Sequence, residues 1–214
     1  MKRAIIYLCI SAVYFIGCTK STENTSSTIN FQLKAANSPV NGAGIVWSAG
    51  TAGVALAKIE SKKKDSGYVE FRVDPNTQID LFGVLSISNV TIPVGTYYNN
   101  TCRLELQAMN NKPSLYLEGI YTAGGIATPV SFEAAVPITI KSTKEIIEIA
   151  KGISIYNALT TLSLITLTAD VTEAEMKTAV RTTGKIIISR ASNDGIYFKM
   201  LANLAKNQVI EFKQ

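Results

Sequence analysis

Hydrophobic residues alternate with polar or small residues along most of the chain between residues 29 and 167. A period of two places successive side chains on opposite faces of a strand, so each such run predicts a half-buried β-strand. Residues typical of turns separate the runs at the spacing of an all-β domain. The clearest runs hold Ile29, Phe31, Leu33 and Ala35, then Val69, Phe71 and Val73, then Cys102, Leu104 and Leu106, and finally residues 126–140.

These strands predict a mainly β fold with two packed antiparallel sheets, because one sheet alone could not cover its apolar face. The expected class is an antiparallel β-sandwich of the immunoglobulin or prealbumin type, followed by a short α/β C-terminal portion. Residues 93–97, Pro-Val-Gly-Thr-Tyr, support this class. They resemble the tyrosine corner of immunoglobulin-like sandwiches, in which a Tyr hydroxyl ties a strand start to nearby backbone. A simple turn before a strand is the alternative.

Residues 37–42, Asn-Ser-Pro-Val-Asn-Gly, and residues 110–113, Asn-Asn-Lys-Pro, predict turns between strand-like runs. Two further short segments are expected to be hairpin turns. Residues 62–64 are three lysines followed by Asp-Ser-Gly, and they predict a solvated hairpin tip rather than a contact with membrane headgroups. Gly124 and Gly125 lie between two strand-like runs, which favours a turn over a phosphate-binding loop, since that loop would open a helix. Residues 142–155 fit helical and strand periods alike, and their isoleucine content favours a strand.

The C-terminal part changes character. Thr172 and Glu175 have the spacing of a capping box and predict a short helix, which Gly184 could end. Further expectations are a short buried strand over residues 185–189, a second helix capped by Asn193 or Asp194, and a last strand over residues 209–212.

The first 17 residues have the layout of a signal peptide. Lys2 and Arg3 are followed by an uncharged apolar stretch over residues 4–17. This stretch is shorter than the roughly 20 residues that span a bilayer, and its position after a charged start predicts a cleaved secretory signal. The polar residues 18–28 predict a flexible tether. Residues 29–214 are expected to form one β-sandwich domain with its C-terminal helices packed on it, since no linker rich in Pro, Gly or Ser divides them.

Residues 15–18, Phe-Ile-Gly-Cys, resemble a bacterial lipobox, although Phe15 stands where Leu is usual. The resemblance implies cleavage between Gly17 and Cys18 and lipidation of Cys18, which would hold the chain in a membrane by several acyl chains. Thr19 is not the Asp associated with inner-membrane retention, so the outer membrane is the expected location. A plain secretory signal with an accidental Cys is the alternative.

The composition excludes several kinds of chemistry. The sequence has no histidine, which excludes Ser-His-Asp and Cys-His catalysis and the common zinc sites. Cys102 is the one cysteine outside the leader region, and its strand-like run predicts a buried, inert thiol. The net charge is +5, and Lys2 and Arg3 supply two of these charges, so the chain after the leader carries +3, too little for a nucleic-acid-binding face. No catalytic residue, cofactor or metal site is predicted.

A few side chains are weighed as candidates for chemistry. Trp47 could stack on a sugar if exposed, but a Trp beside apolar neighbours is more often part of the core. Glu105 and Glu118 would share the outward face of one hairpin and could form the carboxylate pair of a glycoside hydrolase. A solvated surface, with Arg103 pairing with Glu118, is the favoured alternative. Asp74 opens an oxygen-rich segment that lacks the Gly and the Glu of an EF-hand.

The chain resembles a family of bacterial surface lipoproteins with a domain of unknown function. The resemblance rests on three short segments: Gly-Ile-Val-Trp over residues 44–47, Asp-Leu-Phe-Gly over residues 80–83, and Ile-Pro-Val-Gly-Thr-Tyr over residues 92–97. It covers roughly residues 29–168 and implies a β-rich domain behind a lipid anchor. The family supplies no catalytic residues.

Together these features predict a lipid-anchored protein of the bacterial outer membrane that acts as a non-enzymatic binding or structural module. Its expected partners are the membrane, through Cys18, and a protein or glycan ligand. A periplasm-facing envelope assembly protein is the second hypothesis, and a carboxylate-dependent glycan hydrolase is the third. An exposed Trp47 would favour ligand binding, an exposed apolar patch would favour assembly, and a cleft floored by Glu105 and Glu118 would favour hydrolysis.

Overall fold

The computed structural model of the chain describes residues 25–36, 43–64, 66–83, 86–204, 206 and 209–213. The predicted signal peptide, the predicted cleavage site at Gly17 and Cys18, and residues 37–42, where a turn is expected, lie outside the described residues. In the described part, the protein is mainly β, with two mixed sheets and three short helices. No helix in that part has the length and apolarity needed to cross a bilayer.

The smaller sheet has four strands in the described residues, and its strand order is β13-β10-β1-β5. The first strand begins at Ser26, within the stretch expected to be a tether, and the Ser27 hydroxyl donates a hydrogen bond to the Ile153 carbonyl at 2.6 Å. Alternate residues from Ile29 to Leu33 are buried, as the period of two predicts. The bounds are β1 (Ser26–Ala36), β5 (Ser86–Pro93), β10 (Ile155–Ser163) and β13 (Val209–Lys213).

The larger sheet is organised around one long strand, β2. Ala52 on this strand pairs with both β7 and β4, and Val54 pairs with both β6 and β4. Because a strand residue has one neighbour on each side, β7 and β6 occupy successive stretches of the same side of β2, and β4 and β3 occupy the other. The bounds are β2 (Ile45–Lys63), β3 (Gly67–Val73), β4 (Thr77–Asp80), β6 (Gly95–Leu106), β7 (Leu115–Ala123), β8 (Ile126–Ala134), β9 (Ile138–Ile149), β11 (Arg181–Thr182) and β12 (Lys185–Ser189).

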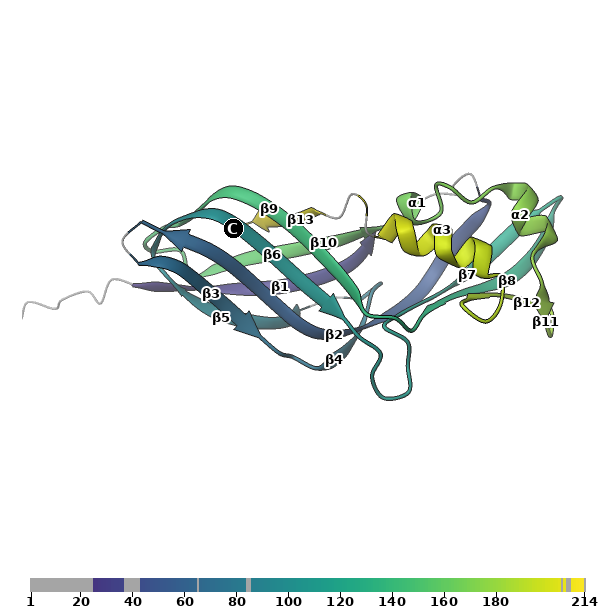
Figure 1. Cartoon of the computed structure of the whole chain (residues 1–214), viewed down its shortest axis with the longest axis horizontal. Coiled ribbons are helices and arrows are strands. Elements are labelled where there is room, and N and C mark those ends of the chain that lie inside the picture. Colours follow the sequence, from purple (N-terminus) through teal and green to yellow (C-terminus); the bar gives the residue numbers. More distant parts are fainter. Residues whose placement is uncertain are drawn as a thin grey trace, which may run out of the picture.

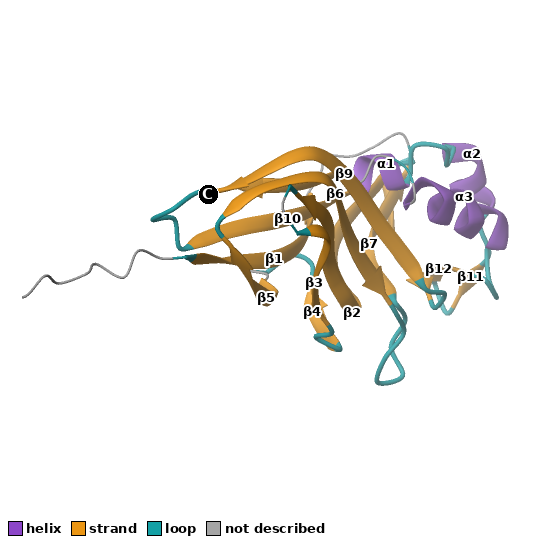
Figure 2. Ribbon diagram, turned by 60° about the vertical axis from the view of Figure 1, so that its left-hand side comes forward, coloured by secondary structure: helices purple, strands orange, loops and turns teal. Residues whose placement is uncertain are grey.

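The two halves of the molecule bury their apolar faces differently. In one half the smaller sheet faces β3, β2, β6 and β9, and the sheet edges come together, β3 beside β5 and β13 beside β9 (Figure 1). In the other half, helices cover one face of β7, β8 and β12 (Figure 1 and Figure 2). The helices are α1 (Leu164–Leu167), α2 (Glu173–Thr178) and α3 (Asp194–Leu204).

Several local predictions are confirmed. The Tyr97 hydroxyl donates to the Pro93 carbonyl at 2.7 Å, which is the bond expected of the tyrosine corner. Thr172 and Glu175 form a complete capping box at the start of α2. The strand predicted over residues 142–155 is confirmed as far as Ile149, where β9 ends, whereas residues 150–154 form no strand. Gly124 and Gly125 form the turn between β7 and β8 with positive φ.

The expectation of purely antiparallel sheets is wrong. β1 runs parallel to β10, and β8 runs parallel to β12. Parallel partners need a crossover rather than a hairpin, and here the crossovers are long segments that include other strands. Alternation along one strand reports which face is buried but not the direction of its neighbour, so the sequence pattern could not distinguish the two cases.

Three element boundaries also differ from the predictions. The strand run expected to reach residue 167 ends at Ser163, whose hydroxyl accepts a hydrogen bond from the Thr166 amide and so caps α1. Helix α2 ends at Thr178, because Ala179 adopts extended backbone angles, and Gly184 lies instead in the turn between β11 and β12. The alternating run over residues 126–140 is two strands, interrupted at residues 135–137.

Candidate functional site

A cleft of about 830 Å³ opens where the parallel strands β8 and β12 end. It lies between the loop that joins β6 to β7 and the segments that follow β8 and β12. Ligands commonly bind at the carboxyl ends of parallel strands, where the chain leaves the sheet and side chains from separate segments converge. The lining residues are 108–113, Glu133, Ala135, Val136, residues 189–191 and Tyr197.

Gly53 in the middle of β2 holds the base of the loop over residues 107–114, hereafter the cleft loop. The Gly53 amide donates to the Ser114 carbonyl at 3.1 Å, and the Gly53 carbonyl accepts from the Gln107 amide at 2.8 Å. A Cβ at this position would lie 2.3 Å from the Gln107 carbonyl oxygen, so only glycine permits this close approach. The cleft loop therefore leaves the sheet at a defined point between the β6 and β7 stretches of β2.

The tip of the cleft loop is a tight two-residue turn. Met109 and Lys112 exchange two backbone hydrogen bonds of 3.0 and 3.1 Å. Asn110 and Asn111 between them have φ of 54° and 58°, the left-handed region that a type I′ turn requires and that Asn tolerates better than most residues. The turn contributes Asn110, Asn111 and Lys112 to the lining of the cleft, and all three residues are exposed.

Two cations and one carboxylate line the cleft. Lys112 and Arg190 are exposed, and neither forms an ion pair with a described residue. Glu133 is half-buried and accepts a 3.3 Å hydrogen bond from the Ser131 hydroxyl. The cleft thus offers cationic donors, neutral amides and one acceptor to a ligand.

Tyr197 is the one aromatic residue among the described lining residues, and its side chain is buried. Tyr197 on α3 is 1% exposed. Its ring packs against those of Phe132 and Phe198, with centroids 5.8 and 5.2 Å away. A ring held this way supports the cleft but presents no open face on which a sugar or base could stack.

A second polar cluster adjoins the cleft on the uncovered face of the sheet. Tyr116 pairs across the strands with Glu133, and its hydroxyl donates to the Glu118 carboxylate. Lys185 lies 3.1 Å from the same carboxylate. The hydrogen bond from Tyr116, and then the one from Lys185, lower the pKa of Glu118 below its ordinary value. Glu118 is therefore a paired carboxylate, not a candidate general acid.

The structure separates the two carboxylates proposed for glycan hydrolysis. β6 and β7 do not form a hairpin with each other, because each pairs with β2. Glu105 lies opposite Leu56 and Glu118 opposite Ala49. These partners are seven residues apart along β2, or roughly 23 Å at about 3.3 Å per residue, beyond the range of a glycosidase pair. Arg103 pairs with Glu105 at 3.4 Å instead of with Glu118.

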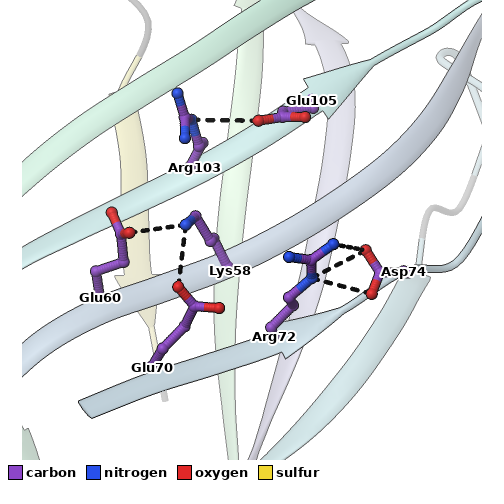
Figure 3. Close-up of polar contacts among 7 residues, drawn as sticks. All are labelled: Lys58, Glu60, Glu70, Arg72, Asp74, Arg103 and Glu105. Atoms are coloured by element: carbon purple, nitrogen blue, oxygen red, sulfur yellow. Dashed lines mark hydrogen bonds and ion pairs between the residues drawn. The ribbon is translucent and has the colours of Figure 1, made fainter.

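Charged side chains also cover the outer face of β3, β2, β6 and β9, and the strand register fixes their relative positions. Figure 3 shows the side chains that come from β2, β3 and β6 and from Asp74, which follows β3. Four cations lie side by side across these strands, and acidic residues flank them on both sides. Lys58 is bonded to Glu60 at 2.7 Å and to Glu70 at 3.0 Å. The cations are Arg72, Lys58, Arg103 and Lys141, and the acids are Glu60, Glu70, Asp74 and Glu105, together the charged face.

The ion pairs of the charged face neutralise most of its charge internally. The guanidinium of Arg72 donates to both oxygens of Asp74 at 2.8–3.1 Å and lowers the pKa of that carboxyl. Asp74 is the residue that opens the oxygen-rich segment, so its carboxylate is occupied by a cation of the protein itself. In the part of the chain that the structure describes, no group of three acidic or cysteine side chains is placed to hold a metal ion.

Trp47 and Cys102 belong to the core, as predicted. Trp47 is 3% exposed, and its indole N–H is buried without a hydrogen-bond partner among the described residues. Cys102 is 1% exposed, and burial raises the pKa of its thiol to about 12, so the thiolate is not populated at neutral pH.

Sequence reasoning identified the Asn110–Asn111 turn but not the cleft that it borders. The residues that complete the cleft, Glu133 and Arg190, carry no local motif, and only the pairing of β8 with β12 brings them together. Comparison of the chain with protein-family models, with curated proteins and with solved structures gives no match in any of the three.

Proposed function

We propose that this protein is a bacterial cell-envelope lipoprotein, anchored in the outer membrane through Cys18, whose domain binds a ligand without catalysing a reaction. The cleft supports this proposal, because two cations that have no ion pair among the described residues and two side-chain amides line it, from segments distant in the sequence. Charges without an ion pair at a concave site favour recognition of a partner, whereas Lys58, Arg72 and Arg103 on the charged face are paired with neighbouring acids.

The anchor would set the orientation of the domain. Residues 19–25 separate Cys18 from the start of β1, and eight extended steps reach at most roughly 29 Å. The start of β1 lies at one end of the long axis, and α2 and β11 lie at the other (Figure 1). A lipidated Cys18 would therefore keep the two facing sheets near the membrane and hold the helical end away from it. We infer that these two sheets are a sandwich of the immunoglobulin or prealbumin type, modified by its parallel strand pairs.

Envelope assembly is the second candidate function, and an apolar row on the uncovered face of the sheet favours it. Val46 and Ile120 are cross-strand partners on β2 and β7, and they are 40% and 47% exposed. Pro129 on β8 continues the row and is also exposed. Such a row could dock on another envelope protein.

Site-specific photocrosslinking in intact cells tests binding at the cleft. A benzophenone amino acid replacing Asn111 is expected to give a crosslinked product, because Asn111 is exposed and lines the cleft. The same replacement of Lys141 on the charged face is the matched control and should give none. Products at both positions or at neither would contradict a binding role for the cleft. The same replacement of Ile120 probes the apolar row, and a product at that position alone would favour envelope assembly.

The anchor is tested separately. Growth with an alkyne-bearing fatty acid should label the wild-type protein, and Cys18→Ser should abolish both the label and the membrane association. Protease treatment of intact cells, with a periplasmic protein as control, then reports whether the domain faces outward or inward. A labelled Cys18→Ser variant would refute the lipoprotein assignment.

A further inference from the structure

We propose that the cleft recognises an extended acidic segment of a partner protein, an inference that rests on the proposed binding function. The mixture of charges, the amides of the cleft loop and the buried Tyr197 ring each narrow the class of ligand.

The cations indicate carboxylates as the groups that are bound. Arg190 follows β12, whereas Lys112 belongs to the cleft loop, so the two charges come from different walls. A guanidinium binds a carboxylate through two parallel hydrogen bonds, and an ammonium binds it as a point charge. Two cations on separate walls suit two acidic side chains of one segment.

Glu133 indicates a peptide rather than a uniform polyanion. Its carboxylate lies in the same cleft and would repel the phosphates of a nucleic acid or a closely sulfated glycan. A peptide main chain presents N–H groups between its acidic side chains, and a carboxylate accepts from them. Asn110 and Asn111 each supply a donor and an acceptor, which suits the amide groups of a peptide.

Tyr197 provides the argument against a neutral sugar. Neutral pyranose rings are commonly held on an exposed aromatic face, and the described lining residues offer none because Tyr197 is buried against Phe132. The remaining apolar lining comes from Met109, Pro113, Val136 and three alanines, which suits aliphatic stems of side chains.

An array of decapeptides that permute acidic, neutral and basic residues tests the proposal, with the full-length detergent-solubilised protein as the probe. Peptides with two or more Asp or Glu are expected to bind, and binding should weaken as salt rises from 50 to 500 mM. Arg190→Glu and Lys112→Glu should each weaken binding by about tenfold or more. Arg181→Glu reverses an exposed charge on β11, outside the cleft, and should leave binding unchanged.

Arg190→Lys keeps the charge but cannot donate two parallel hydrogen bonds to one carboxylate, so its binding should be weaker than that of wild type and stronger than that of Arg190→Glu. Array binding without acidic preference, binding that Arg190→Glu leaves intact, or capture of oligogalacturonate in place of peptides would overturn the acidic-peptide inference. Failure of the inference is distinguishable from failure of the proposed function, because crosslinking at Asn111 in cells reports occupancy of the cleft whatever the class of ligand.

Discussion

The charged face and the cleft are built from the same kinds of residue, but they differ in how the charges are paired. On the charged face, Lys58 lies opposite Arg72 on one side and Arg103 on the other, and acidic residues flank this row of cations. In the cleft, Lys112 and Arg190 come from irregular segments and form no ion pair with a described residue.

The difference follows from regular and irregular structure. Strand register places side chains at fixed neighbouring positions, so opposite charges in adjacent rows neutralise one another and the face remains solvated. Loops at the ends of strands carry no such repeat, and charges there can remain available to a ligand. The charged face should therefore respond to substitution in its stability, and the cleft in its binding.

The largest expected loss of stability comes from Lys58→Ala. The Lys58 side chain is 11% exposed, and it separates Glu60 from Glu70, which are directly opposite each other on β2 and β3. Its removal leaves two facing carboxylates without a cation, which should lower the free energy of unfolding by about 1–3 kcal/mol.

Urea denaturation measures this loss, and Arg72→Ala is the matched control. Arg72 and Asp74 have exposed side chains, so breaking their pair should lower stability by much less. Equal losses for the two variants would refute the distinction between the buried Lys58 and the exposed Arg72.

The charged face should also lose stability in acid. Hydrogen bonds from Lys58 and then from Tyr68 lower the pKa of Glu60 below its ordinary 4.5. A carboxyl with a depressed folded-state pKa stabilises the fold above pH 4.5, and this contribution disappears as the pH falls through the lower folded-state value. Unfolding midpoints measured from pH 7 to pH 2.5 should fall less steeply in Glu60→Gln than in wild type. If the unfolding midpoint of Glu60→Gln falls with decreasing pH as steeply as that of wild type, Glu60 is not a source of the acid-dependent loss.

The reactivity of the Cys102 thiol reports locally on the stability of the sheet beneath the charged face. Cys102 lies on β6 next to Arg103 of the charged face, and its side chain is buried in the core. Its thiol should therefore react with iodoacetamide only when this part of the sheet opens. Alkylation at Cys102, located by peptide mass mapping, should be faster in Lys58→Ala than in wild type and unchanged in Arg190→Ala. Rapid alkylation of the wild-type protein would disprove the burial.

The smallest effect on stability is expected in the cleft. Arg190→Ala and Lys112→Ala remove exposed side chains that have no ion-pair partner among the described residues, so the free energy of unfolding should change by no more than about 0.5 kcal/mol. Thermal or urea unfolding checks this. A loss comparable to that of Lys58→Ala would mean that these cations support the fold and are not held ready for a ligand.

Local chemistry allowed much of this protein to be predicted from its sequence. The alternation around Cys102 and Ile29 identified the buried faces of β6 and β1, since the strand period of two is a property of the backbone itself. The capping box at Thr172, the tyrosine corner at Tyr97 and the Asn110–Asn111 turn each depend on residues a few positions apart, so their geometry is encoded where they stand.

Only the tertiary structure decided which strands are neighbours. It made β1 and β10 parallel, placed β6 and β7 along successive stretches of β2, and thereby moved Glu105 away from Glu118. The cleft likewise exists because Glu133 and Arg190, far apart in the chain, lie at the carboxyl ends of two parallel strands. Strand pairing is a contact between distant segments selected by the whole core, whereas a periodic pattern reports only which face each strand buries.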